Sequence, residues 1–292
     1  MSRNPRLGIW LMIAAVATFA AQDGFSRYLA ETYNTLMIVM IRYWVFAGFV
    51  IVLAQRRPEG PRAAIRSTRL WVHLVRGTLL VAEVCMIVWG YTLIGLIESH
   101  AIFAICPLLI VALSGPMLGE RISWQRWAAV AAGMVGVIVI LRPGTGVFSW
   151  PALLPLASAL FFALYSVLTR LTTRDEPTFP AFFWPAVIGA VLMTLFGLPN
   201  LEPVAVADIA PLAAYCLLCV LSHWLLLKCY EAIEAARVQP YAYLQIVFVT
   251  IIGIVIYGEV LALPVAIGTA IIVAAGLYAL SLERRPIPAV PL

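Results

Sequence analysis

Residues 33–53 read YNTLMIVMIRYWVFAGFVIVL, and Arg42 is the single charged side chain in this stretch. A helix rises about 1.5 Å per residue, so a stretch of this length reaches across the apolar core of a bilayer, which is about 30 Å thick. The apolar run is long and does not alternate with polar residues. It therefore predicts a membrane-spanning helix rather than a strand, because a helix satisfies its own backbone hydrogen bonds within lipid.

Nine further stretches of the same kind are joined by short connections that contain turn residues: residues 7–29, 70–92, 98–117, 125–141, 151–170, 180–198, 208–230, 237–257 and 263–281. The first is interpreted as a helix of the fold rather than a cleaved signal peptide. Of the 292 residues, 63% are hydrophobic and 11% charged, with a mean hydropathy of +1.00. Soluble domains contain about 25% charged residues. We therefore expect an all-α integral membrane protein with ten transmembrane helices.

The loops between these stretches differ in positive charge. With the N-terminus placed in the cytoplasm, fifteen Lys and Arg residues fall in cytoplasmic loops, and only Arg27 and Arg142 fall in outer loops. Because positive loops stay inside, both termini are predicted to be cytoplasmic, in a multi-pass inner-membrane protein surrounded by lipid. The net charge of +5 lies in loops rather than on one face, so we expect no nucleic-acid partner.

The two halves of the chain contain similar motifs. At an offset of 139 residues, Gly119-Glu120 matches Gly258-Glu259, and Tyr91 with Ile94 matches Tyr230 with Ile233. At an offset of 143, Phe19-Ala20 with Arg27 matches Phe162-Ala163 with Arg170. Chance similarity between Leu-rich segments is the alternative. Duplication predicts two five-helix repeats, residues 1–146 and 147–292, and an odd number of helices in each makes the second repeat inverted.

These motifs resemble the drug/metabolite transporter superfamily, specifically its ten-helix EamA-type members. The matching positions are Phe19-Ala20 with Arg27, Arg42-Tyr-Trp-Val-Phe46-Ala47, Pro107, Gly119-Glu120 and Gly258-Glu259. Phe19 stands where the family has Trp, and Ile246 stands where it often has Pro. Within the family the chain looks most like the YddG-type exporters of aromatic and other amino acids. The resemblance implies a secondary transporter with its substrate site between the repeats.

Charged and polar residues inside the bilayer are costly and are therefore candidates for function. Arg42 and Glu83 both lie about 13 Å below the outer surface, so an ion pair between them is geometrically possible. Such a pair either braces the helices or lines the cavity, and both interpretations stay open. Asp23, beside Gln22, either binds a cation or a proton or caps the outer loop.

The other candidates for the cavity lining are aromatic, polar or helix-bending side chains, and plain packing is the alternative for each: Phe19, Phe103, Cys106, Pro107, Phe162, Tyr165, His223, Tyr243 and Gln245. Pro107 leaves a backbone carbonyl unpaired inside its helix, which favours a kink beside a polar ligand. His223 is either a hydrogen-bonded packing residue or a proton relay. His73 is expected at the membrane interface, and Arg76 is expected to extend to the cytoplasmic surface.

Two further patterns predict packing. Cys216-Leu-Leu-Cys219 lies inside a continuous apolar helix without a second ligand pair, which favours packing over a zinc or redox site. All five cysteines lie in or beside apolar stretches: Cys85, Cys106, Cys216, Cys219 and Cys229. Residues 125–141 and 263–281 carry small residues at every fourth position, which allows close helix packing and a homodimer through these helices: Ala128, Ala132 and Gly136, with Ala266, Ala270 and Ala274.

A mostly apolar cavity with one or two fixed charges suits a zwitterion with an apolar side chain. We therefore predict export of amino acids or related metabolites by alternating access, with no metal or cofactor. Clustered arginines for a nucleotide sugar are missing, although another drug/metabolite substrate, such as a nucleotide sugar or a cationic drug, stays an alternative. A sensor or assembly subunit is the second alternative. The chain lacks the motifs of an embedded hydrolase, so no enzyme activity is expected.

Overall fold

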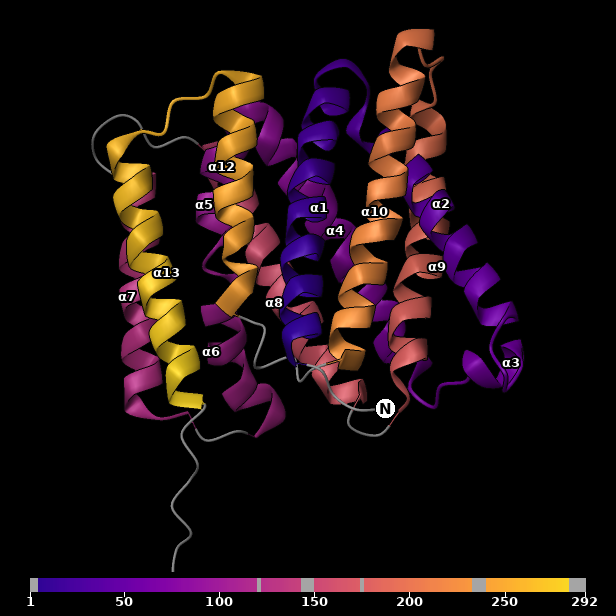
Figure 1. The fold of residues 1–292 in the computed structure, drawn as a ribbon, viewed down its shortest axis with the longest axis horizontal. Helices are drawn as coiled ribbons and strands as arrows, with labels where there is room; N and C mark the ends of the chain where they lie inside the picture. Colours follow the sequence, from indigo (N-terminus) through magenta and orange to yellow (C-terminus); the bar gives the residue numbers. More distant parts are fainter. Residues whose placement is uncertain (1–4, 120–121, 143–149, 174–175, 233–239, 284–292) are drawn as a thin grey trace, which may run out of the picture.

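The computed structural model describes residues 5–119, 122–142, 150–173, 176–232 and 240–283, and regular structure in these ranges is helical (Figure 1). Ten segments of the described chain are long and apolar enough to cross a membrane. The predicted all-α membrane fold is confirmed. The helices are α1 (Pro5–Thr32), α2 (Thr35–Gln55), α3 (Pro61–Ala64), α4 (Leu70–Ile94), α5 (Leu96–Phe103), α6 (Cys106–Leu118), α7 (Trp124–Leu141), α8 (Leu153–Thr173), α9 (Thr178–Gly197), α10 (Val206–Ala232), α12 (Leu244–Tyr257) and α13 (Leu263–Glu283), with short 3₁₀ turns at Trp150–Ala152 and Leu198–Asn200.

The helices pack in matched pairs. α1 packs on α10 and α4 on α8; likewise, α1 packs on α12 and α6 on α8. If each of the first five spans is exchanged for its counterpart five spans later, the α1–α10 contact becomes the α4–α8 contact, and the α1–α12 contact becomes the α6–α8 contact. The α2–α9 and α7–α13 contacts stay the same under this exchange. This pattern fits two related halves around an approximate twofold axis. α1 begins and α13 ends at the same face of the bundle, as an even number of spans requires (Figure 1).

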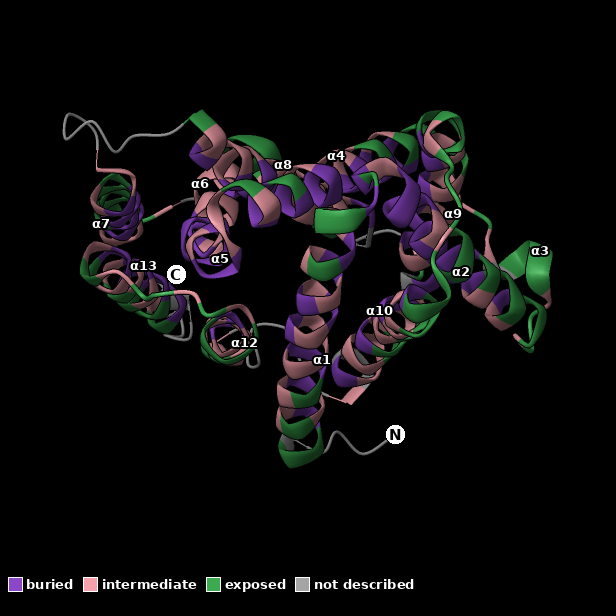
Figure 2. Cartoon of the chain, turned by 90° about the horizontal axis from the view of Figure 1, so that it is seen from above, coloured by how far each residue is buried: buried purple, intermediate pink, exposed green. Residues whose placement is uncertain are grey.

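α7 and α13 lie together at one end of the bundle, away from α1 (Figure 2). A Cβ built on Gly136 would lie 2.7 Å from the carbonyl oxygen of Gly268, and one built on Gly268 would lie 2.5 Å from the carbonyl oxygen of Gly136. The predicted close packing of these helices therefore occurs within one chain. The alanines of the predicted stripe do not form this contact, because most of them are exposed on the other faces: Ala128, Ala132, Ala270 and Ala274. A homodimer through them stays a prediction.

Candidate functional site

Two membrane-spanning segments are each interrupted by a turn. In the span Leu96–Leu118, α5 ends and α6 begins around a turn at residues 104–105, and Pro107 lies in the first turn of α6. Pro is tolerated at this position because the first N–H groups of a helix have no partner within it. In the span Pro240–Tyr257, a turn at Tyr243 precedes α12, although Ile246 replaces the proline there. The two interruptions are 139 residues apart, as the proposed repeat requires.

A polar cluster lies next to these two interruptions. The Asp23 carboxylate of α1 lies 3.1 Å from His100 Nε2 of α5 and accepts a 3.1 Å hydrogen bond from Gln245 Nε2 of α12. His100 Nε2 also lies 3.0 Å from the Tyr91 hydroxyl of α4. Asp23 and Gln245 were candidates from sequence, and the structure brings them together. A carboxylate, an imidazole and an amide from three helices can bind a polar or charged group of a solute.

Neither His100 nor Tyr91 of this cluster was predicted from the sequence as a site residue. His100 lies in an apolar run seven residues before Pro107. An ionisable imidazole inside a membrane span was a sufficient signal to select His100 as a site candidate. The His73 side chain is buried and contacts both Glu176 and Arg76, and its position at the membrane interface stays a prediction.

A row of aromatic rings extends from His100. The ring centroids of His100 and Phe103 are 6.3 Å apart, those of Phe103 and Phe162 are 5.8 Å apart, and those of Phe162 and Tyr165 are 5.8 Å apart. Phe103 lies on α5 and both Phe162 and Tyr165 lie on α8, and all three side chains stay partly exposed. The row therefore joins α5 of the first half to α8 of the second and offers ring faces and edges to a planar solute.

Arg42 and Glu83 are both about 7% exposed, but they form no direct ion pair in the described structure. Arg42 Nη1 donates to the Tyr215 hydroxyl at 3.5 Å. Glu83 Oε1 accepts from the Ser158 hydroxyl at 3.3 Å. The predicted equal depth is compatible with the structure, yet depth alone did not bring the two groups into contact. Neither side chain is therefore neutralised by the other in this structure.

Phe19 and His223 lie in an aromatic group between α1, α2 and α10. The His223 ring centroid is 5.1 Å from that of Phe19 and 4.6 Å from that of Phe46. His223 Nδ1 donates to the Cys219 carbonyl at 2.8 Å. This placement favours packing over a proton relay for His223.

Tyr243 and Cys106 lie on the side of the bundle that faces α13. The Tyr243 hydroxyl contacts Gly276 of α13, and Cys106 is buried in the apolar cluster that also contains Ile272. Their placement favours packing rather than the cavity lining that we predicted. Gln22, next to Asp23, is 3% exposed, and its Oε1 has no hydrogen-bond partner in the described structure.

The expectation that Arg76 extends to the surface is wrong. Arg76 is fully buried, because three partners inside the bundle hold its guanidinium. Nε donates to the Thr169 hydroxyl at 3.0 Å, Nη2 donates to the Ala181 carbonyl at 3.0 Å, and Nη1 lies 2.8 Å from His73 Nδ1. Arg76 thus links α4 to α8 and α9 and is a structural residue.

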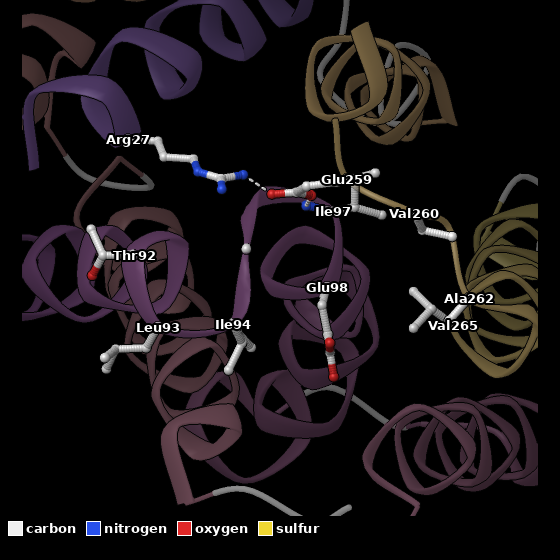
Figure 3. Close-up of a pocket in the computed structure, with 11 residues that line it drawn as sticks. Arg27, Thr92, Leu93, Ile94, Ile97, Glu98, Glu259, Val260, Ala262 and Val265 are labelled. Carbon is white, nitrogen blue, oxygen red and sulfur yellow. Dashed lines mark hydrogen bonds and ion pairs between the residues drawn. The ribbon is translucent and has the colours of Figure 1, made fainter. Parts of the chain in front are cut away.

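The face of the bundle opposite the start of α1 holds a pocket of about 390 Å³ between the two halves, which we call the far mouth (Figure 3). Its lining comes from α1, from the end of α4 and the start of α5, from the segment after α12 and from the start of α13: Arg27, residues 92–95, Ile97, Glu98, Glu259, Val260, Ala262 and Val265. Glu259 belongs to the repeated Gly-Glu motif. Its sequence counterpart, Glu120, lies outside the described residues.

Comparison with known proteins places this fold. The model of the EamA-like transporter family matches residues 6–142 and again 149–281. The riboflavin transporter of Rhizobium johnstonii is 31% identical over 284 residues, covering 95% of this chain and 91% of that protein. The S-adenosylmethionine uptake transporter of Rickettsia prowazekii is 24% identical over 287 residues, covering 95% and 94%. The pseudopaline exporter CntI of Pseudomonas aeruginosa is 24% identical over 270 residues, covering 91% and 94%.

A solved crystal structure covers 96% of this chain and 97% of its own, with a TM-score of 0.63 at 20% identity, which shows the common fold. The relatives named above transport other solutes, so the finer resemblance to amino-acid exporters stays a prediction. The two family matches together cover nearly all of the chain. The protein is therefore a multi-pass membrane transporter of small molecules and belongs to the EamA-like transporter family.

Proposed function

We propose that this protein carries a small organic solute with a planar aromatic ring across the inner membrane by alternating access. The observation that carries the proposal is the ring row of Phe103, Phe162 and Tyr165, which ends at the Asp23–His100 pair. Aromatic side chains stack on planar rings, and the polar cluster supplies the few directed contacts that orient a bound solute.

The named relatives support this class of solute. Riboflavin and S-adenosylmethionine both join a planar heteroaromatic ring to a flexible polar chain. The ring row suits the first part of such a molecule, and the Asp23–His100–Gln245 cluster suits the second. Riboflavin is our first choice of solute, because its transporter shares 31% identity over nearly the whole chain.

Aromatic amino acids are a second candidate, favoured by the separate placement of Arg42 and Glu83. Because these two groups do not bind each other, one of them suits the carboxylate and the other the ammonium group of a zwitterion. Aromatic amino acids thus belong to the same class of solute, a planar ring joined to a polar group.

The site lies between the two proposed repeats, residues 1–146 and 147–292. Asp23, His100 and Phe103 come from the first, and Phe162 and Gln245 come from the second. Rocking of one repeat against the other would therefore separate the two parts of the site and change which face it opens to. α7 and α13 would act as the fixed contact between the repeats, because their backbones meet at Gly136 and Gly268.

Purified protein in liposomes tests the proposal with labelled riboflavin, S-adenosylmethionine and tryptophan. We expect one of them to cross faster than in protein-free liposomes. Uptake and efflux are both measured, because the named relatives include uptake transporters and an exporter. Failure of all three solutes to move would contradict the proposal.

Asp23→Asn should lower transport of the active solute about 10- to 100-fold, because hydrogen bonds to a charged group are worth about 1.5–3 kcal/mol. Glu59→Gln is the matched control, since Glu59 is an exposed carboxylate in the loop between α2 and α3. It should transport at the wild-type rate. Wild-type transport by folded Asp23→Asn would remove this cluster from the site.

A further inference from the structure

Glu259 holds the N-terminus of α5 from the other half of the chain. Its Oε1 accepts the Leu96 backbone N–H at 2.6 Å, and its Oε2 accepts the Ile97 backbone N–H at 2.8 Å. The first N–H groups of a helix have no partner within the helix, so a carboxylate at this position satisfies them and interacts favourably with the helix dipole. Usually a residue just before the helix provides this cap. Here Gly95 occupies that position, at φ +91°, and has no side chain to do so.

Arg27 of α1 joins the same carboxylate. It forms an ion pair with Glu259 (Figure 3), and both side chains are only 14% exposed. The Arg27 guanidinium also lies 4.1 Å from the centre of the Tyr257 ring, and the Tyr257 hydroxyl donates to the Gly24 carbonyl at 2.6 Å. The end of α12 is thus connected to α1 and α5 at the far mouth.

The opposite part of α5 is held by the candidate site. α5 contains eight residues and is bounded by Gly95 and by the turn at residues 104–105. Its His100 contacts Asp23, which lies one helical turn before Arg27 on α1. α5 therefore connects the Glu259 cap at its first turn to Asp23 at its second turn.

We propose that Glu259 is the latch that closes the far mouth, and that α5 transmits the state of the Asp23–His100 site to this latch. The inference rests on the proposed alternating access. When α12 moves away from α1 and α5, the Glu259 carboxylate must leave both backbone N–H groups and Arg27 together. Displacement of His100 from Asp23 by a solute would shift α5 and weaken the same contacts. Glu259 is therefore a positioning residue and does not itself bind the solute.

Labelling of an introduced cysteine measures whether the far mouth is open. Val265 lines the far-mouth pocket and is 4% exposed, so Val265→Cys should react slowly with a maleimide in purified, detergent-solubilised protein. Adding Glu259→Gln should raise the labelling rate about tenfold or more, because charge-assisted hydrogen bonds are roughly twice as strong as neutral ones. The five native cysteines are buried, and the protein without Val265→Cys gives their background.

Glu31→Gln is the matched control. Glu31 accepts from Arg27 Nε at 3.0 Å but is 46% exposed and lies outside the α5 cap, so its loss should change labelling less than threefold. If Glu259→Gln does not fold, Gly95→Ala tests the same latch. A Cβ there would lie 2.8 Å from Glu259 Oε1, on a backbone that disfavours alanine, and it should also speed labelling.

The charge swap Arg27→Glu with Glu259→Arg separates a latch at α5 from a simple ion pair. The swap restores opposite charges but places a cation at the N-terminus of α5, so labelling should stay fast. Slow labelling of the swapped protein, or labelling of Glu259→Gln no faster than that of Glu31→Gln, would overturn the proposal. The measurement uses no solute, so its outcome is independent of whether the transport panel succeeds.

Discussion

Replacing Gly136 with alanine should destabilise the protein at the contact between α7 and α13. The new Cβ would lie 2.7 Å from the Gly268 carbonyl oxygen, well inside the 3.4 Å at which ordinary van der Waals contact begins. This oxygen belongs to a helical backbone and cannot rotate away, so the two helices must separate. Overpacking of this kind costs about 1–3 kcal/mol.

Gly48→Ala is the matched control, because Gly48 is an exposed residue of α2 with no atom within 4 Å of a built Cβ. Both substitutions replace glycine within a helix and gain about 1 kcal/mol of helix propensity. The difference in melting temperature between the two variants therefore reports the steric clash at Gly136 alone. We expect the melting temperature of Gly136→Ala to be about 2–6 °C below that of Gly48→Ala.

The assay is thermal unfolding of each purified variant in the same detergent, followed by tryptophan fluorescence. Adding Gly268→Ala to Gly136→Ala should lower the melting temperature by less than Gly268→Ala lowers that of the wild type. The reason is that Gly136→Ala has already separated the helices. Two results would refute this reasoning: a melting temperature of Gly136→Ala at or above that of Gly48→Ala, or additive decreases in melting temperature for Gly136→Ala and Gly268→Ala. Either would mean that the close backbone contact is not what holds α7 to α13.

Two further predictions concern the opposite end of the bundle. Arg76→Lys should lower stability by about 1–3 kcal/mol in thermal unfolding, since one ammonium cannot reach all the partners that the planar guanidinium binds; unchanged stability would refute this. Although burial raises the pKa of Glu176, hydrogen bonds from Ser67 and Thr68 outweigh it and lower this pKa from 4.5 to about 2. The stability that the Glu176 carboxylate contributes is complete above pH 4.5 and is lost as the pH falls toward 2. Between pH 4.5 and pH 2, the melting temperature of Glu176→Gln should therefore fall less than that of the wild type. An equal fall in both proteins would show that the Glu176 carboxylate contributes no such stability.

The membrane spans were predictable because hydrophobicity over a bilayer thickness is a local property of the chain. Residues 33–53 were predicted, and Thr35–Gln55 is the helix that forms. The interruption near Pro107 was also predictable, since proline lacks the N–H that a continuous helix requires. The matching turn at Tyr243 has no proline nearby and was not predicted as a break.

The candidate site was only partly predictable. Asp23 and Gln245 stand out as polar residues in apolar segments, but their contact depends on how α1 and α12 pack. Equal depth suggested a pair between Arg42 and Glu83, yet depth gives one coordinate, and the rotation of each helix about its axis decides which way a side chain points. For the same reason Asp23 contacts His100 of another helix, whereas Arg42 and Glu83 do not contact each other.

The amino-acid sequence alone determined that this is a membrane protein and how many spans it has, because both follow from the composition of single segments. The tertiary structure decided which charges meet. It buried Arg76 among three partners, brought His100 to Asp23, and placed Glu259 on the end of a helix from the other half. Such contacts join residues far apart in the chain, and only the packing of whole helices, set by close approaches such as Gly136 on Gly268, brings them within bonding distance.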